Sequence, residues 1–302
     1  MQDKPVVGGQ AVIEGVMMRG FGNMAMAVRQ PNGEIAIEQQ PLNSLTDKYP
    51  ILKQPLLRGM VALGEALVYG MKALSNSAQL AGEEEEELSD REMLVTMFTS
   101  ILLAIGLFIV LPTFIAKFLK SYTENLMLLN LLEGLIRLTF FVIYVAVISR
   151  VRDIQRVFEY HGAEHKTIHA YEAGVPLEVE YVRPFSTLHP RCGTSFLLIV
   201  MLVSMVVFSF MGWPDIWQRI GSRILLMPLI AGISYEIIRY AGRNAQSSLV
   251  SVLIVPGLLL QKLTTREPDG EQIEVAIKAL QAVLPAAVSV EQEQEIEIIE
   301  GK

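Results

Sequence analysis

The chain has 302 residues, of which 51% are hydrophobic and only 19% are charged. An ordinary soluble domain carries roughly 25% charged residues, and this composition, with one cysteine, excludes a disordered chain, a collagen and a disulfide scaffold. The net charge of −7 comes from an acidic run at 83–87 and from the tail at 291–302, so the remainder is nearly neutral and nucleic acid is not an expected partner.

The first 92 residues are predicted to fold outside the membrane. Residues 1–50 mix β-branched residues with glycines, and Asn32-Gly33 separates two strand-like runs, which is typical of a hairpin. We therefore expect a small β-rich unit there. Residues 51–92 are expected to form an amphipathic helix and an acidic linker, because apolar side chains recur every three or four residues from Leu56 to Leu74. Such an apolar stripe suits either a soluble core or a membrane surface.

The apolar residues that follow lie in long runs, which indicates a protein embedded in the lipid bilayer. Four runs predict membrane-spanning helices, at 93–116, 126–149, 196–213 and 224–238. Each of the first two is long enough, at 1.5 Å per residue, to cross a hydrocarbon core about 30 Å thick. The run at 249–260 is shorter and contains proline and glycine, so we expect it to re-enter or to lie at the interface.

The sequence thus predicts a mainly α, polytopic membrane protein with about four transmembrane helices and a small N-terminal β-rich cytoplasmic unit. A polar segment separates the two helix pairs, and an amphipathic helix with an acidic tail ends the chain. The units expected are, in chain order, 1–50, 51–92, 93–149, 150–195, 196–240, 241–263 and 264–302.

Basic residues predict the orientation. Arg150, Arg152 and Arg156 directly follow the second span, whereas the connection at 117–125 has only two lysines. Lys and Arg favour the cytoplasmic side of a membrane. We therefore expect a multi-pass protein of the cell membrane, with both termini and the segment 150–195 in the cytoplasm.

All four histidines and the single cysteine lie within a stretch of the polar segment. They are His161, His165, His169, His189 and Cys192. His161 and His165 are four residues apart on a predicted helix that ends at Gly174, so their rings share one face and can bind one metal ion. With Glu164 they form the pattern His-x-x-Glu-His, in which two histidines bind zinc and the glutamate is the general base.

The sequence leaves the other ligands open. His169 is about 12 Å along the helix axis from His161, too far for one undistorted site, but it pairs equally well with His165. His189 and Cys192 lie on a turn with proline and glycine, which suits a ligand loop. One or two loop ligands would complete a tetrahedral site for zinc or another divalent metal. Cys192 has two other interpretations, as a nucleophile or as an inert buried thiol, and hydrogen-bonded histidines without a metal are the alternative for the whole cluster.

Four other charged residues are candidate functional residues. Arg183 and Arg191 could bind an anionic substrate or lipid headgroups, and their alternative roles are topogenic charge or a salt bridge. Glu133 and Arg137 lie four residues apart inside the second span. Charges in a bilayer usually face the bundle interior and pair with one another, so we expect an internal ion pair, with a path for a polar substrate or ion as the alternative.

Long blocks of the sequence resemble the YqhQ-type family of bacterial membrane proteins. The blocks are Gly8–Arg19, Glu159–Glu172, Val182–Phe196 and Leu263–Asp269. The resemblance implies a domain of unknown function that is labelled a predicted metal-dependent enzyme. In the first block, glycines permit close backbone approach, which makes Glu14 a candidate additional ligand or acid–base group, with a turn or a salt bridge to Arg19 as its alternative. We expect the β unit to pack over the segment 150–195.

The leading hypothesis is a metal-dependent hydrolase at the membrane surface, with Glu164 as its base and a substrate that the sequence leaves open. One rival is a transporter or channel with Glu133 and Arg137 in its path, which with four spans and no repeat would form a homo-oligomer. The other rival is a scaffold with a structural zinc. A structural zinc site has four protein ligands and a catalytic one keeps a position open, so the number of ligands separates these hypotheses.

Overall fold

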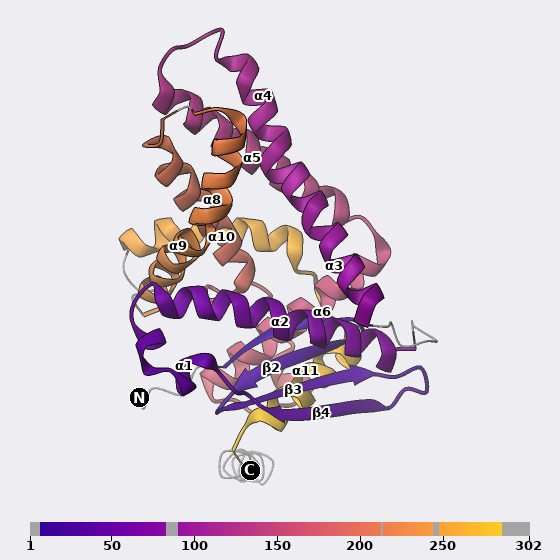
Figure 1. Ribbon diagram of the computed structural model, residues 1–302. Helices are drawn as coiled ribbons and strands as arrows, with labels where there is room; N and C mark the ends of the chain where they lie inside the picture. Colours follow the sequence, from indigo (N-terminus) through magenta and orange to yellow (C-terminus); the bar gives the residue numbers. More distant parts are fainter. Residues whose placement is uncertain (1–6, 83–89, 213, 244–247, 286–302) are drawn as a thin grey trace.

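The computed structural model describes residues 7–82, 90–212, 214–243 and 248–285 (Figure 1). Among the described residues the fold is mainly helical with one four-stranded antiparallel sheet at the N-terminus, which confirms the predicted mainly α fold with a small β-rich unit. Figure 1 shows a head built around the sheet and a bundle of long helices that rises from it. The acidic run at 83–87 and the acidic tail lie outside the described residues.

The sheet is a meander with the strand order β1-β2-β3-β4. Its strands are β1 (Gly8–Val12), β2 (Gly15–Gly20), β3 (Asn23–Arg29) and β4 (Ile35–Pro41). The predicted Asn32-Gly33 turn joins β3 to β4. Gly33 has a φ of 87°, a left-handed conformation that glycine adopts without steric cost.

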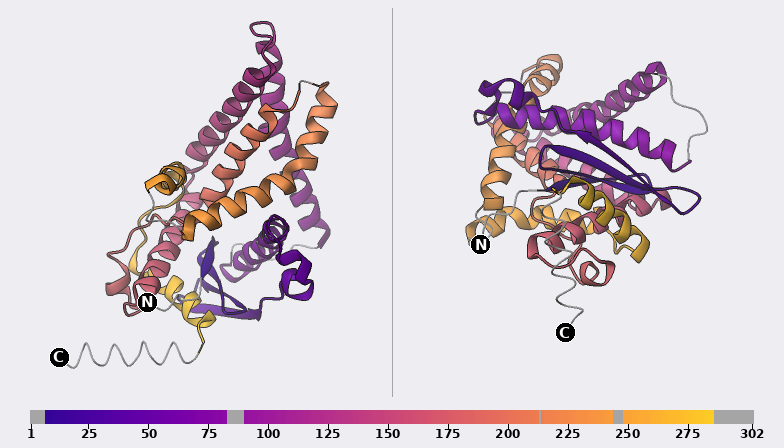
Figure 2. Two further views of the ribbon diagram at one scale, coloured as in Figure 1. Left: turned by 90° about the vertical axis from the view of Figure 1, so that its left-hand side faces the viewer. Right: turned by 90° about the horizontal axis from the view of Figure 1, so that it is seen from below.

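Helices cover both faces of the sheet (Figure 2). Helix α2 (Leu57–Leu80) lies on one face, and α6 (Arg152–Ala173) and α11 (Gly270–Val283) lie on the other. Successive side chains of a strand point to opposite faces, so Met17 enters the core under α2 and Met18 enters the core shared with α6 and α11. The β unit therefore packs against the histidine helix, as expected.

The C-terminal amphipathic helix is part of the head. Ile273, Ile277 and Leu280 of α11 are buried against the sheet and α6. Asp269 and Gln272 form a capping box at its first turn, which satisfies backbone N–H groups that a helix start leaves unpaired. Three parts of the chain that are far apart in sequence thus share one core.

The apolar helices form the bundle. They are α3 (Asp90–Ile105), the π-helical turn η2 (Gly106–Val110), α4 (Leu111–Leu119), α5 (Leu126–Ile148), α8 (Gly193–Ser209), α9 (Ile216–Arg243) and α10 (Ser248–Thr264). The short elements are α1 (Leu45–Lys48), η1 (Pro50–Lys53) and α7 (Val179–Val182).

Within the described ranges, three helical stretches are long and apolar enough to cross a membrane, where the sequence predicts about four. They are Leu94–Leu119, Leu126–Ile148 and Ile216–Ala241. The expected third span is α8, whose 17 residues extend about 26 Å at 1.5 Å per residue, short of a core about 30 Å thick. The run at 249–260 belongs to α10, which lies crosswise where the bundle meets the head (Figures 1 and 2).

Candidate metal centre

Helix α6 places three histidines toward the loop at 183–192. His161, His165 and His169 follow one another at intervals of one turn, and the middle of the helix is buried. The helix ends at Gly174, whose φ of 74° forms the predicted left-handed C-cap.

The first group of candidate ligands joins the helix to the loop. One side-chain donor atom from each of His161, His165 and Cys192 lies within 4.8 Å of the other two. His161 Nε2 is 3.2 Å from Cys192 Sγ, and the two imidazole rings are 4.4 Å apart between centroids. The helix pair expected from its spacing therefore meets the loop cysteine.

Backbone carbonyls set the tautomers of both histidines. His161 Nδ1 is 2.7 Å from the Thr264 carbonyl oxygen, and His165 Nδ1 is 2.6 Å from that of Thr187. A carbonyl oxygen only accepts hydrogen bonds, so each Nδ1 carries the hydrogen and each Nε2 keeps a lone pair. Burial lowers the pKa of His165 below its ordinary value, which favours the neutral ring.

The donor atoms of this group fit a metal ion. His165 Nε2 is buried, and no residue in the described part of the chain forms a hydrogen bond to it. Metal-binding histidines usually donate their other ring N–H to a carbonyl or a carboxylate, as both rings do here. Two imidazole nitrogens and one sulfur suit zinc.

Cys192 also caps α8. Its Sγ accepts a hydrogen bond from the Thr194 backbone N–H at 3.4 Å and lies 3.1 Å from the Thr194 hydroxyl. Burial raises the pKa of the thiol, but the adjacent His165 and the Thr194 contacts outweigh burial and hold that pKa below its ordinary value. The thiolate, the form that binds metals, is thereby favoured.

Glu164 lies beside this group without belonging to it. The residue is 5% exposed, and a Cβ at Gly9 would be 3.0 Å from Glu164 Cδ, so the glycine of β1 leaves room for the carboxyl. Burial raises the pKa of Glu164 to about 8; His161 and the Gly9 N–H act in the opposite direction, and Cys192 raises it further. The glutamate of the His-x-x-Glu-His pattern is thus held next to the candidate ligands.

A second group lies directly beside the first. His169, Glu172 and His189 each offer a donor atom within 4.8 Å of the others. His189 Nε2 is 3.4 Å from Glu172 Oε1, longer than a good hydrogen bond, and burial lowers the pKa of His189. The His189 ring is 4.5 Å from His169 and 5.7 Å from His165 between centroids. The five predicted ligands are therefore divided between two adjacent groups.

Comparison with known proteins agrees with the resemblance in the sequence. The family described as "Protein of unknown function (DUF1385)" matches residues 54–286. The chain belongs to this family. It is 35% identical over 304 residues to the uncharacterized protein YqhQ of Bacillus subtilis (strain 168), covering 96% of each chain. No solved structure matches it. Both groups of candidate ligands lie within the range that this family matches.

The sequence analysis did not single out two residues of this region: Glu172, a member of the second group, and Gln261, which holds the backbone of His189. Gln261 of α10 accepts a hydrogen bond from the His189 N–H at 2.8 Å and donates one to the His189 carbonyl oxygen at 2.8 Å. Glu172 pairs with Arg191. Glu172 follows His169 by three residues, so helical spacing could have identified it, whereas Gln261 is 72 residues from His189 and no local pattern indicates it.

The loop and the end of α10 are held against α6 by close contacts. Lys166 is buried, and its Nζ donates to the carbonyl oxygens of Arg183 and Phe185 at 2.7 Å each. The side chain of Arg183 is exposed. A Cβ at Gly162 would lie 2.0 Å from the Arg266 carbonyl oxygen. Glycine at this position therefore allows the backbone after α10 to approach His161.

Glu14 lies outside both groups. It occupies the turn between β1 and β2 with a φ of 50°. Its carboxylate accepts hydrogen bonds from the guanidinium of Arg156 and, at 3.2 Å, from the hydroxyl of Tyr160. Glu14 thus fastens the sheet to α6 through Arg156, where the sequence suggested Arg19.

Proposed function

We propose that this chain is a membrane-bound, metal-dependent hydrolase whose metal is held by His161, His165 and Cys192. The observation that carries the proposal is that a backbone carbonyl fixes Nδ1–H of both imidazoles and leaves both Nε2 lone pairs available beside a sulfur. No fourth residue of the described chain joins this group. Three protein ligands are typical of catalytic zinc, and four of structural zinc.

A divalent metal in such a site supplies Lewis acidity, which polarises a substrate oxygen and makes water more acidic. The protein has two tasks around it. The carbonyls of Thr264 and Thr187 orient the two rings, and Thr194 with the start of α8 stabilises the sulfur as a thiolate. His165 and Cys192 are buried and His161 is half-buried, and burial strengthens each electrostatic interaction of the group.

We assign the general base to Glu164. Its carboxyl is buried between the candidate ligands and Gly9, so one side is held by the backbone of β1. In hydrolysis the carboxylate takes a proton from water as the water attacks, and it returns that proton to the leaving group. The role requires a carboxyl group that is close to the ligands and free of the metal, which is the arrangement of Glu164. A cation bound beside it would lower its raised pKa and favour the carboxylate form that accepts a proton.

The deciding experiment compares Glu164→Gln with His165→Ala. Glu164→Gln should keep metal content and folding and abolish function, because only the proton acceptor is lost. His165→Ala should lose both metal and function, because a ligand is removed. The measurements are metal per purified chain and rescue of the defect that follows deletion of the gene. Glu180→Gln, an exposed change on α7, is the matched control.

Full rescue by Glu164→Gln, together with failure of the ligand variants, would overturn the hydrolase and leave a structural metal as the better explanation. Full rescue by both variants would remove any metal-dependent role for the first group.

The shared core of the head supports an even number of membrane crossings. The sheet, α6 and α11 contribute to one core, so all three lie on the same side of a membrane. Between α6 and α11 the helix α9 is long and apolar enough to cross once, and if it does, a second crossing is needed to bring the chain back. We propose that α8 supplies it despite its length, which gives four spans.

We also propose that the head faces the cytoplasm. The arginines that follow α5 support this orientation through the preference of positive charge for that side. Single cysteines at Lys120, which is exposed beyond α4, and at Glu180, which is exposed in the head, would be treated with an impermeant thiol reagent in intact cells. We expect the reagent to label the cysteine at position 120 in intact cells. It should label the cysteine at position 180 only after the membrane is permeabilised. The reverse pattern would overturn the orientation.

A further inference from the structure

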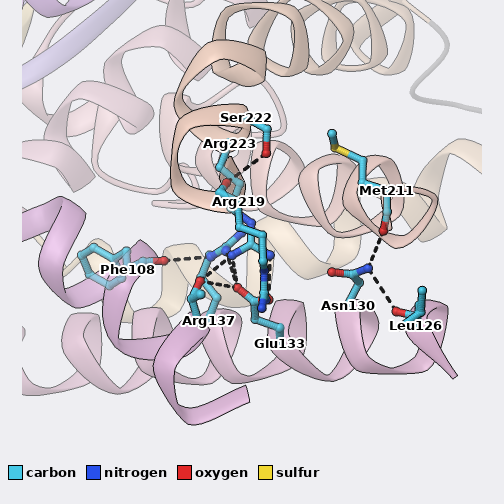
Figure 3. Close-up of polar contacts among 10 residues, drawn as sticks. Phe108, Leu126, Asn130, Glu133, Arg137, Met211, Arg219, Ser222 and Arg223 are labelled. Atoms are coloured by element: carbon cyan, nitrogen blue, oxygen red, sulfur yellow. Dashed lines mark hydrogen bonds and ion pairs between the residues drawn. The ribbon is translucent and has the colours of Figure 1, made fainter. Parts of the chain in front are cut away.

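The bundle contains its own buried polar cluster, on helices other than the histidine helix α6. Glu133 and Arg137 lie on α5, and Arg219 and Arg223 lie on α9. Figure 3 shows the three arginine side chains converging on Glu133. Arg137 Nη2 is 3.3 Å from Glu133 Oε1, Arg223 Nη2 is 2.6 Å from Oε2, and Arg219 also pairs with Oε2. The expected ion pair of Glu133 and Arg137 is thus part of a larger cluster.

The cluster is rigidly positioned. The four charged residues are at most 8% exposed. The Thr113 hydroxyl donates to Glu133 Oε1 at 2.6 Å. Arg137 Nε donates to the carbonyl oxygen of Phe108 at 2.8 Å, which lies in the π-helical turn η2. Helices α4, α5 and α9 therefore hold these groups together without a loop.

Three guanidinium groups of the cluster meet at one carboxylate. Arg137, Arg219 and Arg223 each pair with Glu133. Charged groups inside a bundle of apolar helices cost much free energy and usually mark a functional site. Arginine is also the residue best suited to bind oxyanions, because its planar N–H groups match two oxygens at once.

A cavity opens beside two of these arginines. It has a volume of about 130 Å³, and its lining includes Arg219, Arg223 and Ser222. Water occupies about 30 Å³ per molecule in the liquid, so the cavity has room for an ion of a few non-hydrogen atoms. Asn130 donates to the carbonyl oxygens of Leu126 and Met211 at 3.0 and 2.7 Å (Figure 3), which joins α5 to the end of α8 at the cavity wall.

We propose that this cavity binds a phosphate-type oxyanion, with Arg219 and Arg223 as its principal contacts. A phosphoryl group presents several oxygens to planar guanidinium donors of this kind. The same chemistry is offered by free phosphate and by the phosphomonoester headgroup of a lipid such as phosphatidic acid. The site is separate from the candidate metal centre, so it stands whether or not the hydrolase proposal holds.

The test uses the full-length protein in two arms. In detergent, equilibrium dialysis with radiolabelled inorganic phosphate should show about one saturable site per chain, and phosphate should raise the Tm where chloride of equal ionic strength does not. In nanodiscs that contain phosphatidylcholine with a small fraction of phosphatidic acid, native mass spectrometry should show one retained phosphatidic acid per chain if the source is a lipid. Failure of both arms would overturn the proposal.

Two variants with opposite expected effects on binding distinguish loss of the site from misfolding of the protein. In whichever arm shows binding, Arg223→Gln should weaken that binding about tenfold or more, because charge-assisted hydrogen bonds are lost. Glu133→Gln should strengthen binding, because a competing carboxylate is replaced by a neutral amide; an unfolded protein would not bind more tightly. Arg239→Gln, on the same helix but outside the cluster, should leave binding unchanged. Unaltered binding by Arg223→Gln would place the anion elsewhere and overturn the proposal.

Discussion

The head and the bundle each bury one polar cluster, and the two clusters have opposite chemistry. In the head, His161, His165 and Cys192 present nitrogen lone pairs and a sulfur whose thiolate form is favoured. In the bundle, three guanidinium groups surround one carboxylate. The groups in the head offer lone pairs and suit a cation, whereas the guanidinium groups in the bundle donate hydrogen bonds and suit an anion. Burial alone therefore does not indicate what a polar cluster binds; the balance of donors and acceptors does.

The clusters also differ in what positions them. In the bundle, Glu133 with Arg137 and Arg219 with Arg223 are pairs four residues apart, so two helices suffice to place four side chains. In the head, the rings are oriented by carbonyls from the loop after α7 and from the end of α10. The head cluster should therefore respond strongly to changes in the backbone around it.

The largest expected effect separates the two clusters by ligand. His165→Ala and Cys192→Ala should each reduce bound zinc from about one ion per chain to a small fraction. Loss of a residue that only hydrogen-bonds a ligand lowers metal affinity about 10–100-fold, and loss of a ligand itself should lower it further. The same variants should still bind phosphate as the unchanged protein does. Elemental analysis of purified protein and the dialysis assay measure the two quantities.

His169→Ala is the matched control for the first group, since it removes the same side chain from the same helix. We expect it to retain zinc. Loss of zinc in His169→Ala with retention in His165→Ala would transfer the metal to the second group of candidate ligands.

The next effect tests the dependence of the head on its backbone. Gly162→Ala places a methyl group 2.0 Å from the Arg266 carbonyl oxygen, so the chain after α10 must shift away from His161. We expect a loss of about 1–3 kcal/mol in stability and a metal affinity lower by about 10–100-fold, measured by thermal unfolding and zinc titration. Gly64→Ala is the control: Gly64 is an exposed position of α2 where a Cβ would meet nothing within 4 Å, so the change should be neutral or slightly stabilising. Equal effects of the two changes would contradict the role of the close approach.

Local patterns in the sequence predicted the elements whose structure is decided locally. Helix α2, the turn at Gly33 and the C-cap at Gly174 all follow from residues close together in the chain. The buried face of α2 does not: Leu67 and Leu74 of the apolar stripe are exposed, and the helix buries Ala73 and Ser77 instead. The turns at Glu14 and Phe21 could not be predicted in this way, because non-glycine residues adopt a positive φ there. The place of α11 against the sheet is a long-range contact that no periodicity encodes.

The candidate site was predictable in part for the same reason. The pair His161 and His165 follows from helical spacing, but the division of the five residues into two groups depends on the path of the loop. Lys166 and Gln261 hold that loop through contacts with backbone atoms. In the bundle, the fourth span was expected to begin at residue 224; α9 instead begins at Ile216, which places Arg219 and Arg223 inside the helix.

A smaller effect is expected from the residue that holds His189. Gln261→Leu leaves the buried backbone N–H of His189 without its partner, which costs about 1–3 kcal/mol. The His189 carbonyl oxygen still accepts a hydrogen bond from the Cys192 N–H at 3.3 Å. We expect a clear fall in Tm with zinc retained, because His189 lies outside the first group. Gln281→Leu, exposed on α11, is the control. Loss of zinc at a temperature where the variant is folded would show that the two groups act as one site.

The smallest effect is expected where the sheet meets α6. Arg156, the partner of Glu14, has a side chain that is 50% exposed, and exposed ion pairs contribute only about 0–1 kcal/mol. Glu14→Gln keeps an oxygen that can accept from Tyr160, so stability should fall by less than about 1 kcal/mol, and zinc content should be unchanged. Glu164→Gln should also keep zinc, but it should abolish function where Glu14→Gln retains it. If Glu14→Gln lost zinc, the turn between β1 and β2 would reach the metal, and the head cluster would require the sheet as well as the loop and α10.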